Sequence, residues 1–154
     1  CSDSCEVCSK RFCDRTIREC LMCGKRICKI DSEICVDCKQ YVCPTDREFC
    51  AICNQIHCGN DSAVCEICEQ MYSKGCVQNS HCNTCNNFIS ISSDSSEVSE
   101  IVSMDSELGK FKKWEHASNS RFSMYKGKKM FGKKIIVYDK QQKQIIVNKK
   151  GGWR

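Results

Sequence analysis

Residues 5–64 consist of four consecutive 15-residue blocks: CEVCSKRFCDRTIRE (5–19), CLMCGKRICKIDSEI (20–34), CVDCKQYVCPTDREF (35–49) and CAICNQIHCGNDSAV (50–64). Each block begins with a C-x2-C motif, here named the leading pair, and a third cysteine follows after four residues. In the second to fourth blocks an Asp stands three residues beyond that cysteine, which makes a C-x2-D motif, the trailing pair. A fixed period indicates a serial architecture of copied units. Because each unit carries four potential ligands, we expect the array to fold around a row of zinc ions.

The chain has 18 cysteines in 154 residues, a density that indicates either a disulfide framework or a metal framework. Three features favour zinc. C-x2-C is the usual chelating spacing, the carboxylates at positions 31, 46 and 61 recur in register, and the segments between cysteines are short and charged. The alternative is a secreted or cell-surface disulfide protein, which would resist chelators and collapse with reductant.

The order of ligand pairs along the chain leaves two main pairings open. The favoured one is a cross-brace, in which each leading pair joins the next leading pair and each trailing pair joins the next trailing pair. Local closure, with the two pairs of one repeat on one ion, is the alternative, and it strands Cys82, Cys85 and Cys1. The cross-brace predicts five complete sites: Cys5, Cys8, Cys20 and Cys23; Cys28, Asp31, Cys43 and Asp46; Cys35, Cys38, Cys50 and Cys53; Cys65, Cys68, Cys82 and Cys85; and Cys58, Asp61 and Cys76 with His81 as candidate fourth ligand.

Cys1 occupies the second slot of a trailing pair, since it precedes Cys5 by the same interval as Asp31 precedes Cys35. We therefore expect a cysteine three residues upstream of it. Cys1 would share a further site with Cys13, and Asp14 could supply a ligand because Thr16 holds the usual Asp slot. In total, about five to six structural Zn²⁺ ions are expected.

The order Cys20–Cys23, Cys28–Asp31, Cys35–Cys38 and Cys43–Asp46 resembles that of the B-box zinc fingers, especially the plant type, a cross-braced family related in shape to RING domains. The gap between the first two pairs is shorter here than in that family, and the last pair is Cys/Asp instead of His/His. The resemblance concerns ligand order over residues 1–86. It implies compact modules of short β-hairpins with a helical turn, used for protein–protein contact, and it does not imply ligase activity.

Two columns of mostly apolar residues recur with the repeat and predict a thin core. The first column directly precedes the third cysteine and contains Phe12, Ile27, Val42, His57 and Tyr72. The second directly precedes the leading pair and contains Ile34, Phe49 and Val64, with Glu19 as the exception. Because His57 lies in the first column, we interpret it as a packing residue. Such a core is too small to fold alone, and metal binding supplies the remainder.

Charge and composition divide the chain into three segments. Residues 1–86 carry 10 Lys/Arg and 12 Asp/Glu. Residues 87–109 carry 5 Asp/Glu and no Lys or Arg, and residues 110–154 carry 14 Lys/Arg and 2 Asp/Glu. The middle segment, rich in Ser and acid, predicts an exposed linker with a short helix near 97–108. In the last segment, IIVY (135–138) and QIIVN (144–148) flank a polar turn, which predicts a β-hairpin. The expected fold class is thus a small, zinc-stabilised, irregular α+β protein: an elongated tandem cross-brace zinc-finger array, a linker, and a basic segment with a β-hairpin.

Closed four-ligand zinc sites leave no open coordination position, so we expect a non-enzymatic interaction or scaffold protein that docks within a larger assembly. The alternative is a nucleic-acid-associated factor. Its basic segment would contact phosphates, with Trp114 or Tyr125 stacking on a base; the candidate lysines are Lys126, Lys128, Lys129, Lys133, Lys134, Lys149 and Lys150. We expect protein partners, no membrane partner, and an intracellular location, in the cytoplasm or a cytoskeletal assembly in preference to the nucleus.

Overall fold

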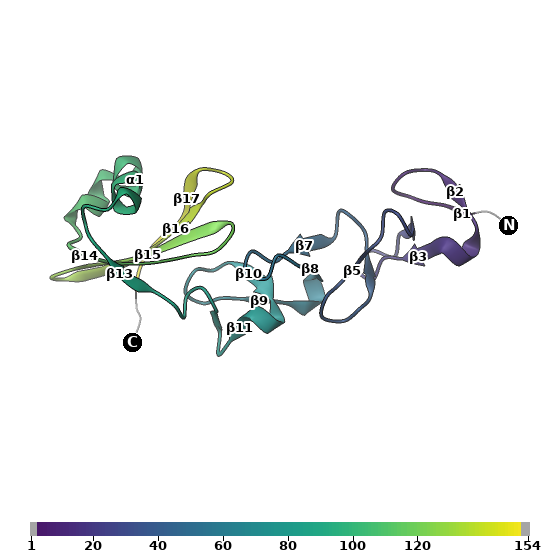
Figure 1. The fold of residues 1–154 in the computed structure, drawn as a ribbon, viewed down its shortest axis with the longest axis horizontal. Helices are drawn as coiled ribbons and strands as arrows, with labels where there is room; N and C mark the ends of the chain where they lie inside the picture. The colour runs from purple at the N-terminus through teal and green to yellow at the C-terminus, as the bar shows by residue number, and fades with distance from the viewer. Residues whose placement is uncertain (1–2, 152–154) are drawn as a thin grey trace. The chain divides into compact units, whose positions relative to one another are not determined.

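The structure is a computed structural model that describes residues 3–151. Contacts divide the chain into two units. Unit 1 comprises residues 1–63 and 71–76, and unit 2 comprises residues 64–70 and 77–154. The fold is mostly β, with one α-helix (Figure 1).

Unit 1 is a series of two-stranded antiparallel hairpins, one for each repeat, joined in places by single 3-10 turns. The hairpins are β1 (Asp3–Ser4) with β2 (Arg11–Phe12), β3 (Ile17–Glu19) with β4 (Arg26–Cys28), β5 (Glu33–Ile34) with β6 (Tyr41–Val42), β7 (Arg47–Phe49) with β8 (Ile56–Cys58), and β9 (Ser62–Val64) with β10 (Met71–Ser73). The turns are η1 (Asp14–Thr16), η2 (Gly59–Asp61) and η3 (Lys74–Cys76). In each hairpin the leading pair lies in the loop, and the trailing pair begins at the end of the second strand.

Each loop has the same backbone geometry, which begins at the first cysteine of the leading pair. In the second repeat the Cys20 amide donates to the carbonyl of Lys25 over 2.9 Å, and the Gly24 amide donates to the carbonyl of Cys20 over 2.9 Å. The residue after the second cysteine is left-handed in every loop; the φ values are 60° at Ser9, 72° at Gly24, 62° at Lys39, 57° at Asn54 and 59° at Glu69. A left-handed residue reverses the chain within one turn, and the C-x2-C segment therefore curls around its own sulfurs.

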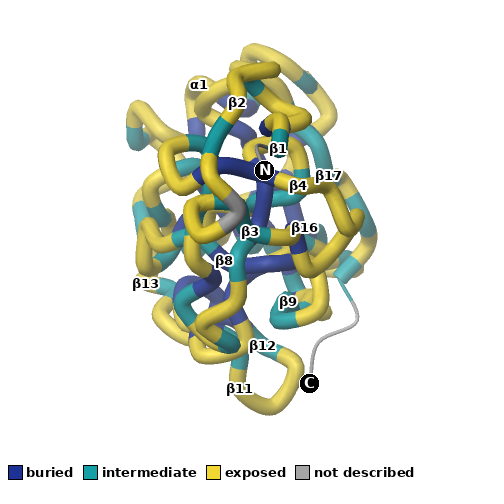
Figure 2. Tube along the Cα trace, turned by 90° about the vertical axis from the view of Figure 1, so that its right-hand side faces the viewer, coloured by how far each residue is buried: buried dark blue, intermediate teal, exposed yellow. Residues whose placement is uncertain are grey.

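The predicted thin core is half right. In the first column Ile27, Val42, His57 and Tyr72 are buried, and Phe12 packs against the same cluster. The second column is exposed instead: Ile34 is 53% and Phe49 60% exposed. Strand alternation explains the difference, because Ile34 pairs with Tyr41 while its neighbour Glu33 pairs with the buried Val42. Along the chain trace the buried positions lie between exposed turns (Figure 2).

Unit 2 contains a small hairpin followed by a larger antiparallel sheet. The hairpin joins β11 (Val77–Gln78) to β12 (His81–Cys82) through Asn79 and Ser80, whose φ values of 50° and 65° fit the type I′ turn that matches strand twist. The sheet has the order β13 (Ile89–Ile91), β14 (Lys113–Ser118), β15 (Phe122–Lys129), β16 (Gly132–Asp139) and β17 (Gln144–Lys150). It is a meander with every neighbouring pair antiparallel.

The helix α1 (Ser96–Met104) and the turn η4 (Ser106–Lys110) connect β13 to β14 and cover one face of this sheet (Figure 1). Ser95 caps the helix, because its side chain accepts a hydrogen bond from the Val98 amide. The buried core combines residues of the helix and turn with residues of the sheet; its members are Val98, Ile101, Leu108, Phe111, Trp114, Tyr125, Ile136 and Tyr138.

Three sequence expectations concern residues 87–154. The hairpin of 135–138 with 144–148 is confirmed as part of β16 and β17, and the short helix near 97–108 is confirmed as α1 with η4. The exposed linker at 87–109 differs from what the structure shows, since Val98, Ile101 and Leu108 are buried and β13 pairs with β14. The acidic and Ser residues of this segment fill the outer positions of an ordered helix and strand. Within the described residues, no helix is long and apolar enough to cross a membrane.

Candidate metal centres

Five clusters of ligand-bearing side chains lie along the described part of the array. In each cluster one ligand atom per residue lies within 4.8 Å of every other. The clusters are Cys5, Cys8, Cys28 and Asp31; Cys20, Cys23, Cys43 and Asp46; Cys35, Cys38, Cys58 and Asp61; Cys50, Cys53 and Cys76; and Cys65, Cys68, Cys82 and Cys85. These clusters could hold metal ions.

The first cluster shows how the chain builds each centre. The leading pair Cys5–Cys8 comes from the loop of one hairpin, and Cys28 and Asp31 come from the end of β4 in the next hairpin. Backbone hydrogen bonds hold the loop against β4, because the Glu6 amide donates to the carbonyl of Arg26 over 2.8 Å and the Cys28 amide donates to the Cys5 sulfur over 3.3 Å. Each centre therefore joins two repeats instead of closing within one.

The same hydrogen bonds recur at fixed offsets in the following repeats. The Leu21 amide donates to Tyr41 and the Val36 amide to Ile56, both over 2.9 Å. The amide–sulfur contact recurs as well: the Cys43 amide donates to the Cys20 sulfur over 3.3 Å, and the Cys58 amide donates to the Cys35 sulfur over 3.4 Å. In unit 2 the Glu66 amide donates to the carbonyl of Ser80 over 2.9 Å, which sets the last leading pair against β12 in the same way.

The sulfur–sulfur distances fit a metal centre and not a disulfide. They are 3.8 Å for Cys23 with Cys43, 3.9 Å for Cys38 with Cys58 and 3.9 Å for Cys68 with Cys82. A tetrahedral ion with Zn–S bonds of about 2.3 Å separates its sulfurs by roughly 3.8 Å, whereas a disulfide bond is about 2.05 Å long. All 17 cysteines from Cys5 to Cys85 are free thiols.

The Asp of each mixed cluster lies among the thiols and is held ionised by them. Asp31 Oδ2 accepts from the Cys28 sulfur over 3.0 Å and from the Cys5 sulfur over 3.2 Å. The thiols of Cys28, Cys8 and Cys5 keep the pKa of Asp31 below its usual range, and the Asp31 carboxylate in turn raises the pKa of Cys8 to about 12. The thiols of this cluster therefore donate their protons to the Asp31 carboxylate in hydrogen bonds. A divalent cation bound by the same atoms would replace those protons.

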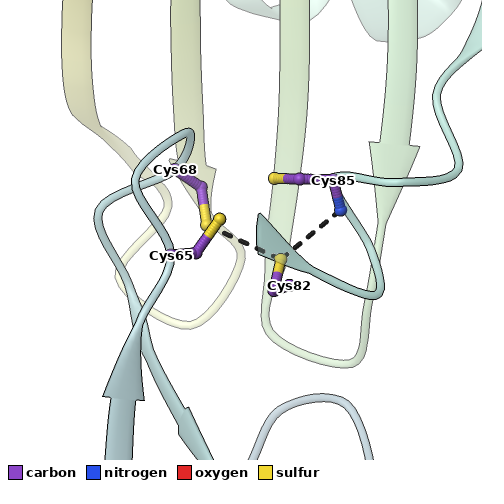
Figure 3. Close-up of side chains that lie close together, drawn as sticks. All are labelled: Cys65, Cys68, Cys82 and Cys85. Atoms are coloured by element: carbon purple, nitrogen blue, oxygen red, sulfur yellow. Dashed lines mark hydrogen bonds between the residues drawn. The ribbon is translucent and has the colours of Figure 1, made fainter. Parts of the chain in front are cut away.

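The last cluster contains four cysteines and belongs to unit 2. Figure 3 shows Cys65 and Cys68 on one side and Cys82 and Cys85 on the other, with the Cys85 amide donating to the Cys82 sulfur over 3.4 Å. The pKa of the Cys82 thiol is lowered to about 7: the largest contribution, from Cys65, opposes this shift, but hydrogen bonds from Cys68 and Cys85 outweigh it. A thiol with this pKa readily gives up its proton to a metal near neutral pH.

Side chains of unit 2 connect the last cluster to the five-stranded sheet. Asn119 Nδ2 donates to Thr84 Oγ1 over 3.1 Å, between Cys82 and Cys85, and Lys149 Nζ bonds Glu69 Oε1 over 2.7 Å, directly after Cys68. Within unit 2, these contacts tie both halves of the last cluster to the sheet.

The predicted cross-brace pairing is wrong in four of its five complete sites. Cys20 and Cys23 do not join Cys5 and Cys8, Cys43 and Asp46 do not join Cys28 and Asp31, and Cys50 and Cys53 do not join Cys35 and Cys38; Cys76 and His81 do not join Cys58 and Asp61. The leading pair of each repeat meets the trailing pair of the next. Only the set Cys65, Cys68, Cys82 and Cys85 is grouped as expected.

Hairpin geometry explains the error. Within one repeat, the loop and the trailing pair lie at opposite ends of a strand such as β4, whose three residues span roughly 10 Å, so local closure fails as well. The loop that carries Cys5 lies alongside β4 of the next hairpin. It therefore reaches the end of β4 that carries Cys28, and it does not reach the loop that carries Cys20. The leading-to-leading pairing implied by the B-box resemblance therefore does not apply.

The remaining candidate ligands lie outside the five clusters. Cys13 is exposed and joins none of them, and Cys1 lies outside the described residues, as does the side chain of Asp14. His81 lies on β12 and is absent from all five. His57 is buried in the core, as expected of a packing residue, and its Nδ1 lies 2.9 Å from the Ser62 hydroxyl.

One signal in the sequence could have identified the pairing. An apolar residue directly before the third cysteine, such as Ile27 or Val42, marks that cysteine as the end of a strand. This signal is absent at Cys82, which follows His81 at the end of β12. Spacing alone cannot show which neighbouring strand a loop contacts.

The structure also corrects the stacking residues proposed for the basic segment. Trp114 and Tyr125 are both 2% exposed in the core of the sheet, with their rings edge to face at 6.4 Å, so neither can stack on a base. Two of the candidate lysines are engaged within unit 2, since Lys128 pairs with Glu115 over 3.4 Å and Lys149 pairs with Glu69.

Comparison of this chain with protein families, with curated proteins and with solved structures finds no match to any of them. The clusters of Cys and Asp within a small, mostly β protein are compatible with stabilisation by a metal such as zinc.

Proposed function

We propose that this protein is a non-enzymatic, zinc-binding interaction protein whose metal centres hold consecutive repeats together. The observation that carries the proposal is the donor set. Four clusters each offer four Cys or Asp ligands, two from each of two hairpins, at a sulfur spacing that suits a tetrahedral ion. Structural zinc sites of this kind contribute about 10–16 kcal/mol to folding. Bound zinc would be four-coordinate in these clusters, with no position left for a substrate.

The core of unit 1 supports a structural role for the metal. Six of the eight residues in its main buried cluster are cysteines, and Ile27 and Val42 are the other two. So few apolar side chains bury too little surface to offset the conformational entropy of folding. Replacement of thiol protons by zinc supplies the missing free energy and cross-links neighbouring hairpins.

The exposed apolar residues of unit 1 support a role in protein contact. Ile34 and Phe49 directly precede successive leading pairs and are both more than half exposed, and Leu21 and Met22 within another leading pair are also exposed. Apolar side chains therefore recur on the surface with the repeat. Such surfaces suit a protein partner with a complementary apolar face, and we propose that the repeats present them within a larger intracellular assembly.

Native mass spectrometry of the full chain, purified without reductant or chelator, tests the metal proposal. We expect up to five zinc ions, lost together with the hairpin structure on treatment with a strong chelator. Reductant without chelator should leave both intact. A chain that binds no metal, or one whose mass falls short by the hydrogens of disulfide formation, would overturn the proposal and favour a secreted or surface protein.

Substitutions at the exposed column test the interaction role. Phe49→Ser should leave zinc content and unfolding unchanged while it weakens partner association measured by quantitative proximity labelling in cells. Arg47→Ser is a matched control on the same strand, because its guanidinium lies over the Phe49 ring at 5.2 Å and it removes a charge instead of an apolar surface. Equal labelling profiles for wild type and Phe49→Ser would contradict the role.

A basic cavity on the sheet favours nucleic-acid binding as a second candidate function. The cavity has a volume of about 320 Å³, and Glu115, which pairs with Lys128, lies in its lining. The other charged and hydroxyl residues of the lining are Lys112, Lys113 and Lys126 with Ser90, Ser92 and Ser93. Ammonium groups beside hydroxyls suit a phosphate. Burial lowers the pKa of Lys126 below its ordinary value.

Fluorescence anisotropy with random oligonucleotides at several salt concentrations tests this candidate. Affinity that falls steeply with salt, and that weakens in Lys113→Gln but not in Lys143→Gln at the β16–β17 turn, would support it. Equal effects of the two substitutions would indicate a general charge effect and exclude a binding site in the cavity.

A further inference from the structure

The cluster of Cys50, Cys53 and Cys76 differs from the other four because it has three ligands. Among the described residues, no fourth cysteine, histidine or carboxylate belongs to it. The repeat register shows where the fourth ligand is missing. The first slot of the trailing pair holds Cys28, Cys43 or Cys58 in the second to fourth repeats and Ser73 here, while the second slot, Asp in those three repeats, holds Cys76.

The backbone places Ser73 where the missing thiolate would be. The amides of Cys28, Cys43 and Cys58 each donate to the first sulfur of the leading pair they face. The Ser73 amide makes the equivalent hydrogen bond to the Cys50 sulfur. The substitution therefore changes the donor atom at this slot and leaves the main chain in register.

The hydroxyl at this slot is engaged by another residue. Ser73 is 3% exposed, and its Oγ donates to Asp37 Oδ2 over 2.8 Å. A neutral hydroxyl is a weaker zinc ligand than a thiolate, and the Asp37 carboxylate that accepts its proton lies outside the cluster. Neither side chain is therefore a strong fourth ligand.

Solvent can reach this centre from the leading pair, because Cys53 is exposed while Cys50 and Cys76 are buried. Zinc retains four ligands, and where the protein supplies three the fourth position is taken by water or by an external donor. Three thiolates without a fourth protein ligand also hold the ion less securely than a complete set.

We propose that the Cys50–Cys53–Cys76 centre binds zinc through three thiolates and leaves its fourth coordination position to an exchangeable ligand, which is water in dilute buffer and a small thiol where one is present. It would be the labile metal site among four structural ones. This inference rests on the proposed function, since it assumes that the array binds zinc.

Zinc release to a chromophoric chelator, followed in the full-length, zinc-loaded protein, tests the proposal. We expect one of five equivalents to leave at least about tenfold faster than the others, because loss of an outer-shell partner alone already costs about 10–100-fold in metal affinity and this centre lacks a direct ligand. Ser73→Cys should remove the fast phase. Asp46→Cys is the matched control: it makes a centre that is already complete all-thiolate, and it should leave the fast phase unchanged.

Cys76→Ser provides a second test if Ser73→Cys does not fold, and should bind four zinc ions with no fast phase. In the cobalt-substituted wild type, a small thiol should strengthen the sulfur-to-cobalt charge-transfer absorption of one equivalent, and in Ser73→Cys it should not. Release of all five ions in one phase, a fast phase that persists in Ser73→Cys, or a wild type that binds only four ions overturns this inference and leaves the proposed function standing. A chain that binds no zinc overturns the proposed function itself.

Discussion

Single residues set the loop geometry on which each metal centre depends. The position after each leading pair is left-handed in all five loops, yet only one of the five residues is Gly. Non-Gly residues there accept about 1–2 kcal/mol of steric cost. The strained conformation is kept at the four non-Gly positions because the loop must direct both sulfurs of the leading pair toward one metal centre. These positions are Ser9, Lys39, Asn54 and Glu69.

Gly24→Val should destabilise the metal-loaded protein by about 1–2 kcal/mol. Its backbone φ is 72°, where a β-branched side chain is strained, although a Cβ would meet only Glu19 Oε1 at 3.6 Å. The effect therefore comes from the backbone and not from a clash. Denaturant unfolding in the presence of zinc measures it. Lys25→Val, one residue later at an ordinary φ, should stay within about 0.5 kcal/mol; an equal loss in the two variants would refute the backbone explanation.

At the scale of elements, the β16–β17 hairpin depends on one buried carboxylate. Asp139 is 1% exposed, and its Oδ1 accepts from the amides of Gln141 and Gln142 over 2.8 and 3.1 Å while its Oδ2 accepts from Arg121 Nη2 over 3.1 Å. Burial alone would raise the pKa of Asp139, but these hydrogen bonds outweigh it and hold the pKa below its ordinary value.

Asp139→Asn should destabilise the sheet by about 1.5–3 kcal/mol at neutral pH, the usual contribution of hydrogen bonds to a charged group. Because the folded pKa is depressed, the wild-type contribution is complete above the unfolded pKa of about 3.9 and falls as the pH drops through the folded value. Unfolding followed by Trp114 fluorescence in a Trp153→Phe background, at pH 7 and pH 3, measures this. The difference between wild type and Asp139→Asn should shrink at pH 3, and a constant difference would refute the assignment.

The β15–β16 hairpin combines a buried strand with an exposed tip. Ile136→Ala should cost about 2–5 kcal/mol, because Ile136 is fully buried in the core beside Tyr125. Phe131→Ser should change the free energy of unfolding by no more than about 0.5 kcal/mol, since the ring is 92% exposed. Thermal unfolding followed by Trp114 fluorescence, in the same Trp153→Phe background, compares the two. A large loss in Phe131→Ser would mean that the tip packs in solution.

At the scale of the whole molecule, the local structure of each repeat could be predicted from the sequence. Which segments of the chain contact each other could not. The 15-residue period identified the repeats, the column containing Ile27 and Val42 identified core positions, and IIVY with QIIVN identified a hairpin. Each of these features depends on neighbours within one strand or turn. The pairing of Cys5 with Cys28 was missed because it depends on which strand a loop lies against. The helix near 97–108 was expected, but the polar composition of 87–109 hid its packing, because a few apolar residues such as Ile101 are all that its buried side requires.

Removal of metal should separate the two kinds of stability in the chain. Unit 1 has a buried cluster made mainly of cysteines, whereas the sheet of unit 2 has a core with four aromatic rings: those of Phe111, Trp114, Tyr125 and Tyr138. A strong chelator with reductant should therefore unfold residues 3–63 and release the hairpin around Cys82, while α1 and the sheet stay folded.

Hydrogen exchange by mass spectrometry on the full chain measures this peptide by peptide. Protection should be lost throughout the repeats and retained from β14 to β17, and the fluorescence of Trp114 should stay that of a buried indole. Restored zinc should return protection to the repeats, since the hairpins are short and local. Loss of protection in the sheet at the same chelator concentration would mean that the Cys65–Cys68–Cys82–Cys85 centre, through Thr84 and Glu69, stabilises the sheet as well as the array.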